Sequence, residues 1–398
     1  MCWFWRILAT AVVAVILYMG IYYLARRPAL ARLPALPNLT NHSRAVAQHL
    51  READRVARRR PNDADSIGML AMAYHADGFY EHALYCYTVV QALDQTNWKW
   101  IYYPSLLDEH LGNTRAVVEH LHAVLAKKDD LALAWYRLGD AEFKLDRYEE
   151  ADQAYRQAMS TNPTRRVSDS ASPDSPDWST RRFLIGDYAL LGLARVALVE
   201  GQVEAARQFL EQVIDQSPDF GPAHSMLGRV LAQLGDDEKA RGHHKRADML
   251  TRYLPPADPM LDVLIRESHN TRVLRKYAQL AQANGNVSRA RFLTRLAMEV
   301  DPDGCDDAQN MGLLLFDLDL KTEAIPYLRR HLETKGQRHR FGTMHRFALC
   351  LIGSGQTDEA ETYLRGAIER HPNVREFYNN LGTLHASQSK HDEAIRDY

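Results

Sequence analysis

The chain has 398 residues, of which 46% are hydrophobic and 25% charged, a composition that indicates a folded protein and excludes a disordered one. Lysine and arginine number 49 against 51 for aspartate and glutamate, so no basic excess draws the chain to nucleic-acid phosphates. The four cysteines form no CxxC or CxxCH motif and no zinc-type Cys/His spacing, which argues against a zinc finger, a c-type haem and a disulfide framework.

The first predicted element is a transmembrane signal anchor within residues 1–27. Residues 7–25 read ILATAVVAVILYMGIYYLA without a charge, which is long enough to cross the roughly 30 Å hydrocarbon core of a bilayer. Aromatic residues flank both ends of this stretch, and two arginines follow it, as membrane interfaces favour. A cleaved signal peptide is the alternative, because Ala29, Leu30 and Ala31 form an A-x-A sequence.

More arginines follow the apolar segment than precede it, namely Arg26, Arg27, Arg32 and Arg44 against Arg6. The positive-inside bias therefore predicts a single-pass protein whose body lies in the cytoplasm, with an extracytoplasmic body as the alternative. Beyond the anchor, we expect a linker at 28–42 and then a capping helix or partial repeat at 43–63.

A period of 34 residues begins at Ala64 and continues at Trp98 and Ala132. The segment from Ala132 reads ALAWYRLGDAEFKLDRYEEADQAYRQAMSTNP, with two amphipathic helical runs, small residues where helices cross, and a proline where the second run ends. Its signature positions hold Trp135, Leu138, Gly139, Tyr148, Ala151, Tyr155, Ala158 and Pro163, and in these the segment resembles the tetratricopeptide repeat. Further frames begin at Asp187, Gly221, Thr271, Cys305, Phe341 and Arg375.

This resemblance implies an all-α fold, a right-handed superhelical solenoid of antiparallel helix hairpins, here preceded by one transmembrane helix. The frames divide into three blocks: three repeats at 64–165, two at 187–254 and four at 271–398, the last of them incomplete. Between the blocks, residues 166–186 form a Ser/Asp/Pro-rich loop, and residues 255–270 form a proline-containing linker with room for one short helix.

Two places depart from the repeat pattern. Pro104 lies where the second frame should hold leucine, which predicts a kinked or late-starting helix. The last frame stops at Tyr398, part-way through its second helix, which favours a fragment of a longer product over a frayed cap with Leu381, Leu384, Ile395 and Tyr398 partly exposed.

The chemistry-bearing residues predict no catalysis. The sequence holds no G-x-S-x-G, HExxH or P-loop motif, so we expect neither an enzyme nor a small-molecule substrate or cofactor. Histidines gather at His120 and His122, at His243 and His244, and at His331, His339 and His345. Adjacent or alternate residues of a helix point to different faces, so these groups predict no metal site.

What remains is a binding surface. In tetratricopeptide arrays, the first helices of the repeats line a concave groove, which the resemblance places here at Tyr102, Leu106, Tyr136, Phe143, Tyr188, Arg195, Arg229, Arg275, Gln279 and Gln282. Aromatic residues followed by arginine and glutamine suit an extended or helical peptide with some negative charge. The alternative is that the tyrosines only pack between neighbouring helices.

The leading hypothesis is therefore a membrane-anchored protein-interaction scaffold or assembly factor that binds a partner peptide or helix in this groove. It contacts the lipid bilayer through residues 7–25 and binds no nucleic acid. A regulatory or substrate-presenting arm of a larger enzyme, with the catalytic part outside this chain, is the alternative. A sensor or secretion-apparatus subunit is a third hypothesis.

Overall fold

The computed structural model describes residues 33–161, 184–250, 255–301, 308–334 and 341–398, and every regular element in those ranges is a helix. None of these helices combines the length and the apolar character that a bilayer span needs. The predicted anchor at 7–25 lies outside the described residues. The chain divides into two compact units, one up to Asn270 and one from Thr271.

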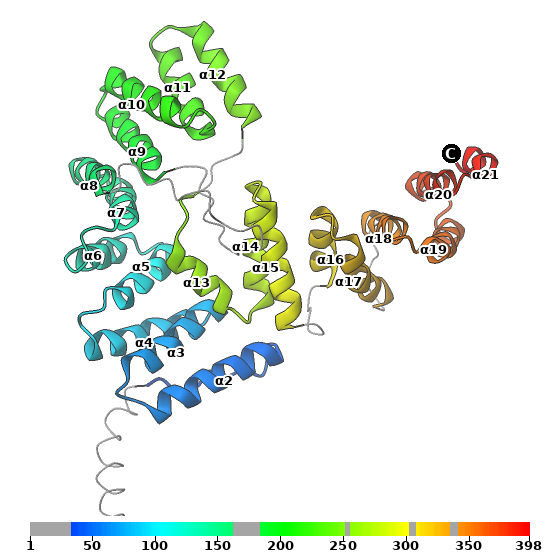
Figure 1. Ribbon diagram of the computed structural model, residues 1–398, viewed down its shortest axis with the longest axis horizontal. Coiled ribbons are helices and arrows are strands. Elements are labelled where there is room, and N and C mark those ends of the chain that lie inside the picture. Colours follow the sequence, from blue (N-terminus) through cyan, green and yellow to red (C-terminus); the bar gives the residue numbers. More distant parts are fainter. Residues whose placement is uncertain (1–32, 162–183, 251–254, 302–307, 335–340) are drawn as a thin grey trace, which may run out of the picture. The chain divides into compact units, whose positions relative to one another are not determined.

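The first unit is a stack in which each helix packs against the next, from α2 to α12 (Figure 1). Its helices are α2 (Arg44–Arg59), α3 (Ala64–Asp77), α4 (Tyr80–Leu93), α5 (Lys99–Leu111), α6 (Thr114–Leu125), α7 (Ala132–Lys144), α8 (Tyr148–Thr161), α9 (Ile185–Val199), α10 (Val203–Gln216), α11 (Gly221–Gln233), α12 (Asp237–Met249) and α13 (Pro259–Glu267). Helix α8 packs directly on α9, so the stack continues across the Ser/Asp/Pro-rich stretch.

The second unit repeats the same arrangement, with each helix packed on its successor. Its helices are α14 (Thr271–Ala283), α15 (Val287–Val300), α16 (Ala308–Asp317), α17 (Lys321–Glu333), α18 (Phe341–Gly353), α19 (Thr357–Arg370), α20 (Arg375–Ser387) and α21 (His391–Asp397). In the last hairpin, Leu381 and Leu384 are buried, which differs from the frayed-cap alternative, in which both would be partly exposed. Ile395 and Tyr398 are 75% and 67% exposed.

One aromatic ring joins the two predicted blocks of the first unit. Tyr155 of α8 is fully buried between Gly139 of α7 and Gly192 of α9, and its hydroxyl donates to Asp140 Oδ1 at 2.7 Å. A Cβ on Gly192 would lie 2.4 Å from Cζ of this ring, and one on Gly139 would lie 2.7 Å from Cδ1. Both positions must therefore be glycine for the helices to approach this closely.

Pro104 does not delay the start of α5, which runs from Lys99 to Leu111. Proline has no N–H to donate to the carbonyl four residues earlier, which here belongs to Trp100. Gln91 of α4 replaces that donor, since its Nε2 donates to the Trp100 carbonyl at 2.9 Å. A side chain of the neighbouring helix thus satisfies the group that the proline leaves open, and the helix continues.

Candidate functional site

Residues 255–270 cover the inner side of the first hairpins, and we call them the groove segment. They contain α13, which packs against α3 and α5 within the first unit, as Figure 1 shows. Proline-rich residues precede the helix, and Asp258 caps its N-terminus by accepting from the backbone N–H groups of Met260 and Leu261 at 2.8 and 3.2 Å. The short helix that the linker sequence allowed thus forms, and it lies against the hairpins instead of spanning between blocks.

Three contacts hold the groove segment in place, and the first is built around Asp258. Its second carboxylate oxygen, Oδ2, accepts from the Tyr102 hydroxyl at 2.8 Å and from Arg137 Nη2 at 2.9 Å. Arg137 also pairs with Glu109 of α5. Asp258 and Tyr102 are buried, so these charge-assisted bonds lie in a region of low dielectric constant. We call Asp258, Tyr102 and Arg137 the N-terminal clasp.

The protonation states in the N-terminal clasp follow from burial. Burial raises the pKa of Tyr102 well above its usual value of 10, and the Asp258 carboxylate raises it further against the lowering effect of Arg137. For Arg137, burial works against the charge, but Tyr102, Asp258 and Glu109 more than compensate and raise its pKa. The hydroxyl therefore stays a proton donor, the guanidinium stays charged, and the pair is a recognition element for a carboxylate.

The second contact is apolar. Leu264 and Ile265 of α13 are only 2% and 3% exposed, and Leu264 belongs to the same hydrophobic cluster as the cores of α3 to α7. Val263, on the other side of the same helix, is 41% exposed. Burying two such side chains contributes about 1.5–3 kcal/mol each, which makes them the main apolar anchors of the segment.

The third contact joins the end of the groove segment to Asp77, the last residue of α3. Asp77 Oδ1 accepts from the backbone N–H of His269 at 2.7 Å and from Ser268 Oγ at 3.3 Å. The Asp77 carbonyl accepts from Asn270 Nδ2 at 3.0 Å. On the other side, His49 Nδ1 lies 2.9 Å from Asp77 Oδ2. We call Asp77 with residues 268–270 the C-terminal clasp.

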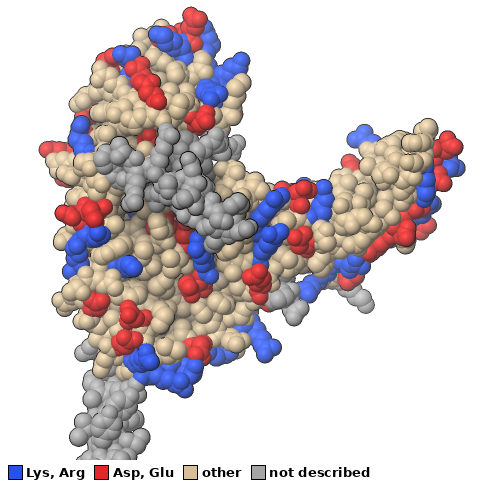
Figure 2. Space-filling view, viewed as in Figure 1, with Lys and Arg blue, Asp and Glu red and all other residues tan. Residues whose placement is uncertain are grey.

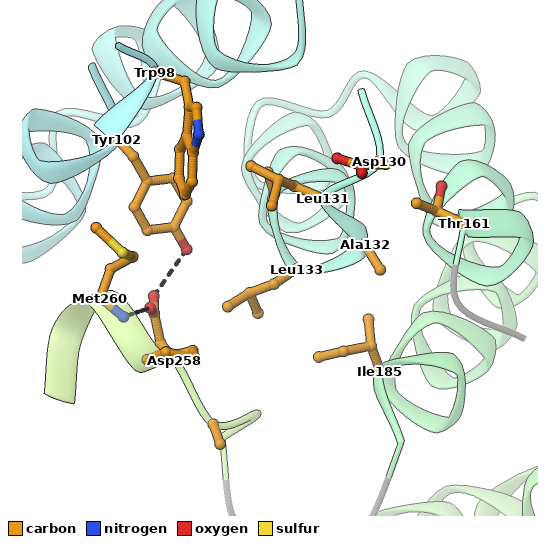
Figure 3. A pocket seen from close by; sticks show the side chains of 13 residues that line it. Trp98, Tyr102, Asp130, Leu131, Ala132, Leu133, Thr161, Ile185, Asp258 and Met260 are labelled. Atoms are coloured by element: carbon orange, nitrogen blue, oxygen red, sulfur yellow. Dashed lines mark hydrogen bonds between the residues drawn. The ribbon is translucent and has the colours of Figure 1, made fainter. Parts of the chain in front are cut away.

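A cavity of about 280 Å³ opens beside the N-terminal clasp. Figure 3 shows Trp98 and Tyr102 on one side and Ile185 on another, with the Asp258 carboxylate reaching the Tyr102 hydroxyl at its edge. The other labelled side chains come from the ends of α7, α8 and α13 and are Asp130, Leu131, Ala132, Leu133, Thr161 and Met260. The lining is mainly apolar with a few oxygen atoms at its border, which suits one apolar side chain of a ligand.

The structure separates the predicted groove residues into buried and accessible ones. Tyr102 and Leu106 are buried in the cluster that the groove segment covers. Tyr136 and Tyr188 are 5% and 4% exposed, and their ring centroids lie 5.8 Å apart. Tyr188 also packs edge-on against Phe220 at 5.1 Å. These contacts give the tyrosines a packing role, which is the alternative that the sequence left open.

The remaining predicted residues are accessible. Arg195 of α9 stacks over the ring of Phe143 of α7 at 4.1 Å, and these two residues are partly buried. Arg195 also pairs with Asp140 at 3.0 Å. Arg229 of α11 is exposed. Arg275, Gln279 and Gln282 lie on α14 of the second unit, where Gln279 is exposed and the other two are partly buried. Figure 2 shows acidic and basic side chains interspersed over most of the visible face.

The first of the predicted histidine groups points in two directions. His120 lies 3.3 Å from Asp108 whereas His122 lies 3.6 Å from Glu142, so the two rings face different neighbours. His243 stacks with His224 of α11 at 5.1 Å. His331 and His345 lie on α17 and α18, and His339 lies outside the described residues.

Sequence reasoning missed Asp77, Arg137 and Asp258 as functional candidates. Each is a charged residue whose partner is far away in the sequence: Asp258 is 156 residues from Tyr102 and 121 from Arg137. The only available signal was the Asp-Pro start of the 258–267 helix with its apolar spacing. That signal predicts a helix but not the surface on which it lies.

The stacked hairpins define the class of helical-repeat solenoids. Within that class, family models of the tetratricopeptide repeat match residues 132–165, 197–248 and 346–398. The resemblance is thereby confirmed for these three segments, which are tetratricopeptide repeats. A comparison with curated proteins finds no match.

Several solved structures are similar. A tetratricopeptide repeat protein from Parabacteroides merdae is 14% identical, with a TM-score of 0.39 over 70% of this chain and 100% of that one. PilF from Pseudomonas aeruginosa is also 14% identical, with a TM-score of 0.37 over 64% and 95%. MamA from Desulfovibrio magneticus is 16% identical, with a TM-score of 0.36 over 52% and 96%. At these TM-scores the likenesses add nothing to the assignment.

Proposed function

We propose that this chain is a protein-interaction scaffold whose first unit binds a short helical peptide of a partner protein, and that the groove segment occupies this site in cis until the partner replaces it. The observation that carries the proposal is the groove segment itself. It is held by an acidic cap, two apolar anchors and a polar end, which is how amphipathic helices bind in grooves.

The cis contacts suggest which partner would compete. A competing helix needs a carboxylate at its N-terminal cap for Tyr102 and Arg137, and apolar residues six and seven positions later in place of Leu264 and Ile265. The neighbouring cavity of about 280 Å³ would accept one further apolar side chain. The sequence predicted an extended or helical peptide with some negative charge, and this pattern would select the helical form.

The accessible residues of the predicted groove extend this proposed surface along the stack. The Phe143–Arg195 pair and the exposed Arg229 offer an aromatic face and positive charge to the same partner. Tyr136 and Tyr188 support that surface from beneath, because their rings are buried.

We further propose that residues 7–25 anchor the scaffold in a membrane, because this uncharged stretch is long enough to span a bilayer. Deletion of residues 1–27 tests the anchor. We expect the shortened chain in the supernatant after ultracentrifugation and the full chain in the carbonate-washed pellet. A shortened chain that still pellets after that wash would show that the repeats themselves hold the membrane.

The peptide site is tested by opening the groove of the full chain in mild detergent. The double variant Leu264→Asp, Ile265→Asp places two charges among the apolar anchors and should release the groove segment. A labelled peptide with the native sequence of residues 255–270 should then bind the variant at least about tenfold more tightly than it binds the wild type, because the cis competitor is gone.

Val263→Asp is the matched control, since Val263 is exposed on the same helix and its change should leave the groove closed. Adding Arg137→Met to the double variant should weaken peptide binding again. If the peptide binds wild type and double variant equally, or binds without any need for Arg137, the groove is not the peptide site. Circular dichroism on each variant verifies that the helices remain.

A further inference from the structure

Two histidines and one aspartate from three separate elements meet at the C-terminal clasp. His49 lies on α2, Asp77 ends α3, and His269 follows α13. One nitrogen of each ring and one carboxylate oxygen all lie within 4.8 Å of one another. The two imidazole rings stack with centroids 3.9 Å apart. All three residues belong to the first unit.

Asp77 is a buried carboxylate that needs positive charge. Its side chain is fully buried, and its hydrogen-bond donors are Ser268 Oγ, the His269 backbone N–H and the His49 ring. Among the described residues, no lysine or arginine forms an ion pair with it. A buried carboxylate without a lysine or arginine partner is a place where a bound cation would be stabilised.

The histidine nitrogens are set up as metal ligands usually are. His269 Nδ1 lies 3.1 Å from the Glu267 carbonyl, which can only accept, so Nδ1 carries the hydrogen and Nε2 keeps its lone pair. A backbone carbonyl that fixes the tautomer in this way is typical of metal-ligating histidines. His49 Nδ1 already faces Asp77 Oδ2 at 2.9 Å, so a metal bound there would replace the proton between them.

We propose that His49, Asp77 and His269 form a binding site for a divalent transition metal of the zinc type. Two imidazole nitrogens and one carboxylate oxygen are a ligand set that Zn²⁺ takes, with water in the fourth position. Bonds of about 2.0–2.2 Å bring tetrahedral ligands roughly 3.3 Å apart, so the rings must open from their stack and the His269 side chain must move inward. His269 is partly exposed.

A metal here would join three elements that are distant in the sequence. Asp77 is 28 residues from His49 and 192 from His269, so one ion would fix the end of the groove segment to both α2 and α3. Metal binding would therefore stabilise the closed groove, because the ligands come together only while the segment is in place. The site is independent of the proposed peptide function and can be tested without any partner.

The test uses the full chain without a polyhistidine tag, stripped with a chelator and titrated with Co²⁺, whose visible absorption reports tetrahedral nitrogen and oxygen ligands. We expect one equivalent to bind, Zn²⁺ to displace it, and Zn²⁺ to raise the melting temperature by about 5 °C. His49→Gln and His269→Gln should each weaken Co²⁺ binding at least about tenfold. His120→Gln, which changes another histidine beside a carboxylate, should leave it unchanged.

Two results would overturn the site. The first is a wild-type chain that develops no tetrahedral Co²⁺ absorption, or that keeps it after both substitutions are combined. The second is a melting temperature that changes with pH through His49 but not with Zn²⁺, which would assign the compensating charge to a proton. Circular dichroism on each variant shows whether the helices are retained, so a loss of metal binding can be separated from unfolding.

Discussion

The two halves of the first unit use one repeat pattern to build different surfaces. Over α3 to α7, the groove segment covers the inner side, and the partly buried Arg137 pairs with the buried Asp258. In α9 to α12, two arginines stay accessible: Arg195 stacks on Phe143, and Arg229 is exposed. The comparison teaches that the repeat signature determines the helix hairpin, whereas the groove segment determines which side chains of the hairpins a partner can contact.

The largest change in the free energy of unfolding should come from Tyr188 in the second half. This residue tests whether a predicted groove tyrosine packs in the core or binds a partner at the surface. Tyr188→Ala should lower the free energy of unfolding by about 3–5 kcal/mol, because a buried aromatic side chain leaves a cavity. Arg229→Ala, from the same predicted set, should change it by less than about 0.5 kcal/mol. Urea unfolding of both variants measures the difference, and equal small effects would restore Tyr188 as a surface anchor.

Arg137 and Arg195 compare a covered arginine with an accessible one. Arg137→Met should destabilise the first unit by about 3 kcal/mol, because it leaves the buried Asp258 charge without its cation. Arg195→Met should cost less than about 1 kcal/mol, since its pair with Asp140 is partly exposed. Hydrogen exchange at residues 259–267 should speed up in the first variant only. Equal exchange in both would mean that the N-terminal clasp does not hold α13.

Gly192 tests the joint between the two halves. Gly192→Val should cost about 2 kcal/mol, because the new Cβ would overlap the buried Tyr155 ring 2.4 Å away. Gly186→Ala, at the start of the same helix with no atom near its Cβ position, should be neutral or slightly stabilising. Thermal unfolding followed by circular dichroism measures both. A tolerated valine at 192 would show that the joint can adjust.

The smallest effect, taken per pH unit, concerns pH and compares one histidine in each half. Burial, with help from His110, lowers the pKa of His75 to about 3, so below pH 6.5 the unfolded chain binds a proton that the folded one does not. Stability should therefore fall as pH drops from 6.5 towards 3, by less than about 1 kcal/mol per pH unit for this partly buried ring.

His75→Gln should flatten that dependence. Burial and the neighbouring His224 also lower the pKa of His243, but that ring is more accessible, so His243→Gln should flatten the dependence less. Urea midpoints measured across this pH range, with each variant compared with the wild type, check the order. A steeper dependence in His75→Gln would contradict the assigned direction of the shift.

The fold was accessible from the sequence because its determinants are local. The frame at Ala132 predicts two helices, and α7 and α8 form there. Gly139 and Tyr155 lie on the two helices of one hairpin, so their contact follows from a helix–turn–helix spacing of 16 residues. At Pro104, the sequence did not reveal that Gln91 of the preceding helix would donate to the Trp100 carbonyl in place of the missing proline N–H.

The candidate site was not accessible in the same way, because its contacts join residues that no short motif connects. By itself the sequence determined the repeat period, the helix pairs and the room for one short helix between residues 255 and 270. Only the tertiary structure decided that α13 lies on α3 and α5, that Asp258 meets Tyr102 and Arg137, and that His49, Asp77 and His269 converge. The physical reason is that hairpin formation depends on neighbours within about 34 residues, whereas the position of a linker depends on which distant surface satisfies its charges and apolar side chains.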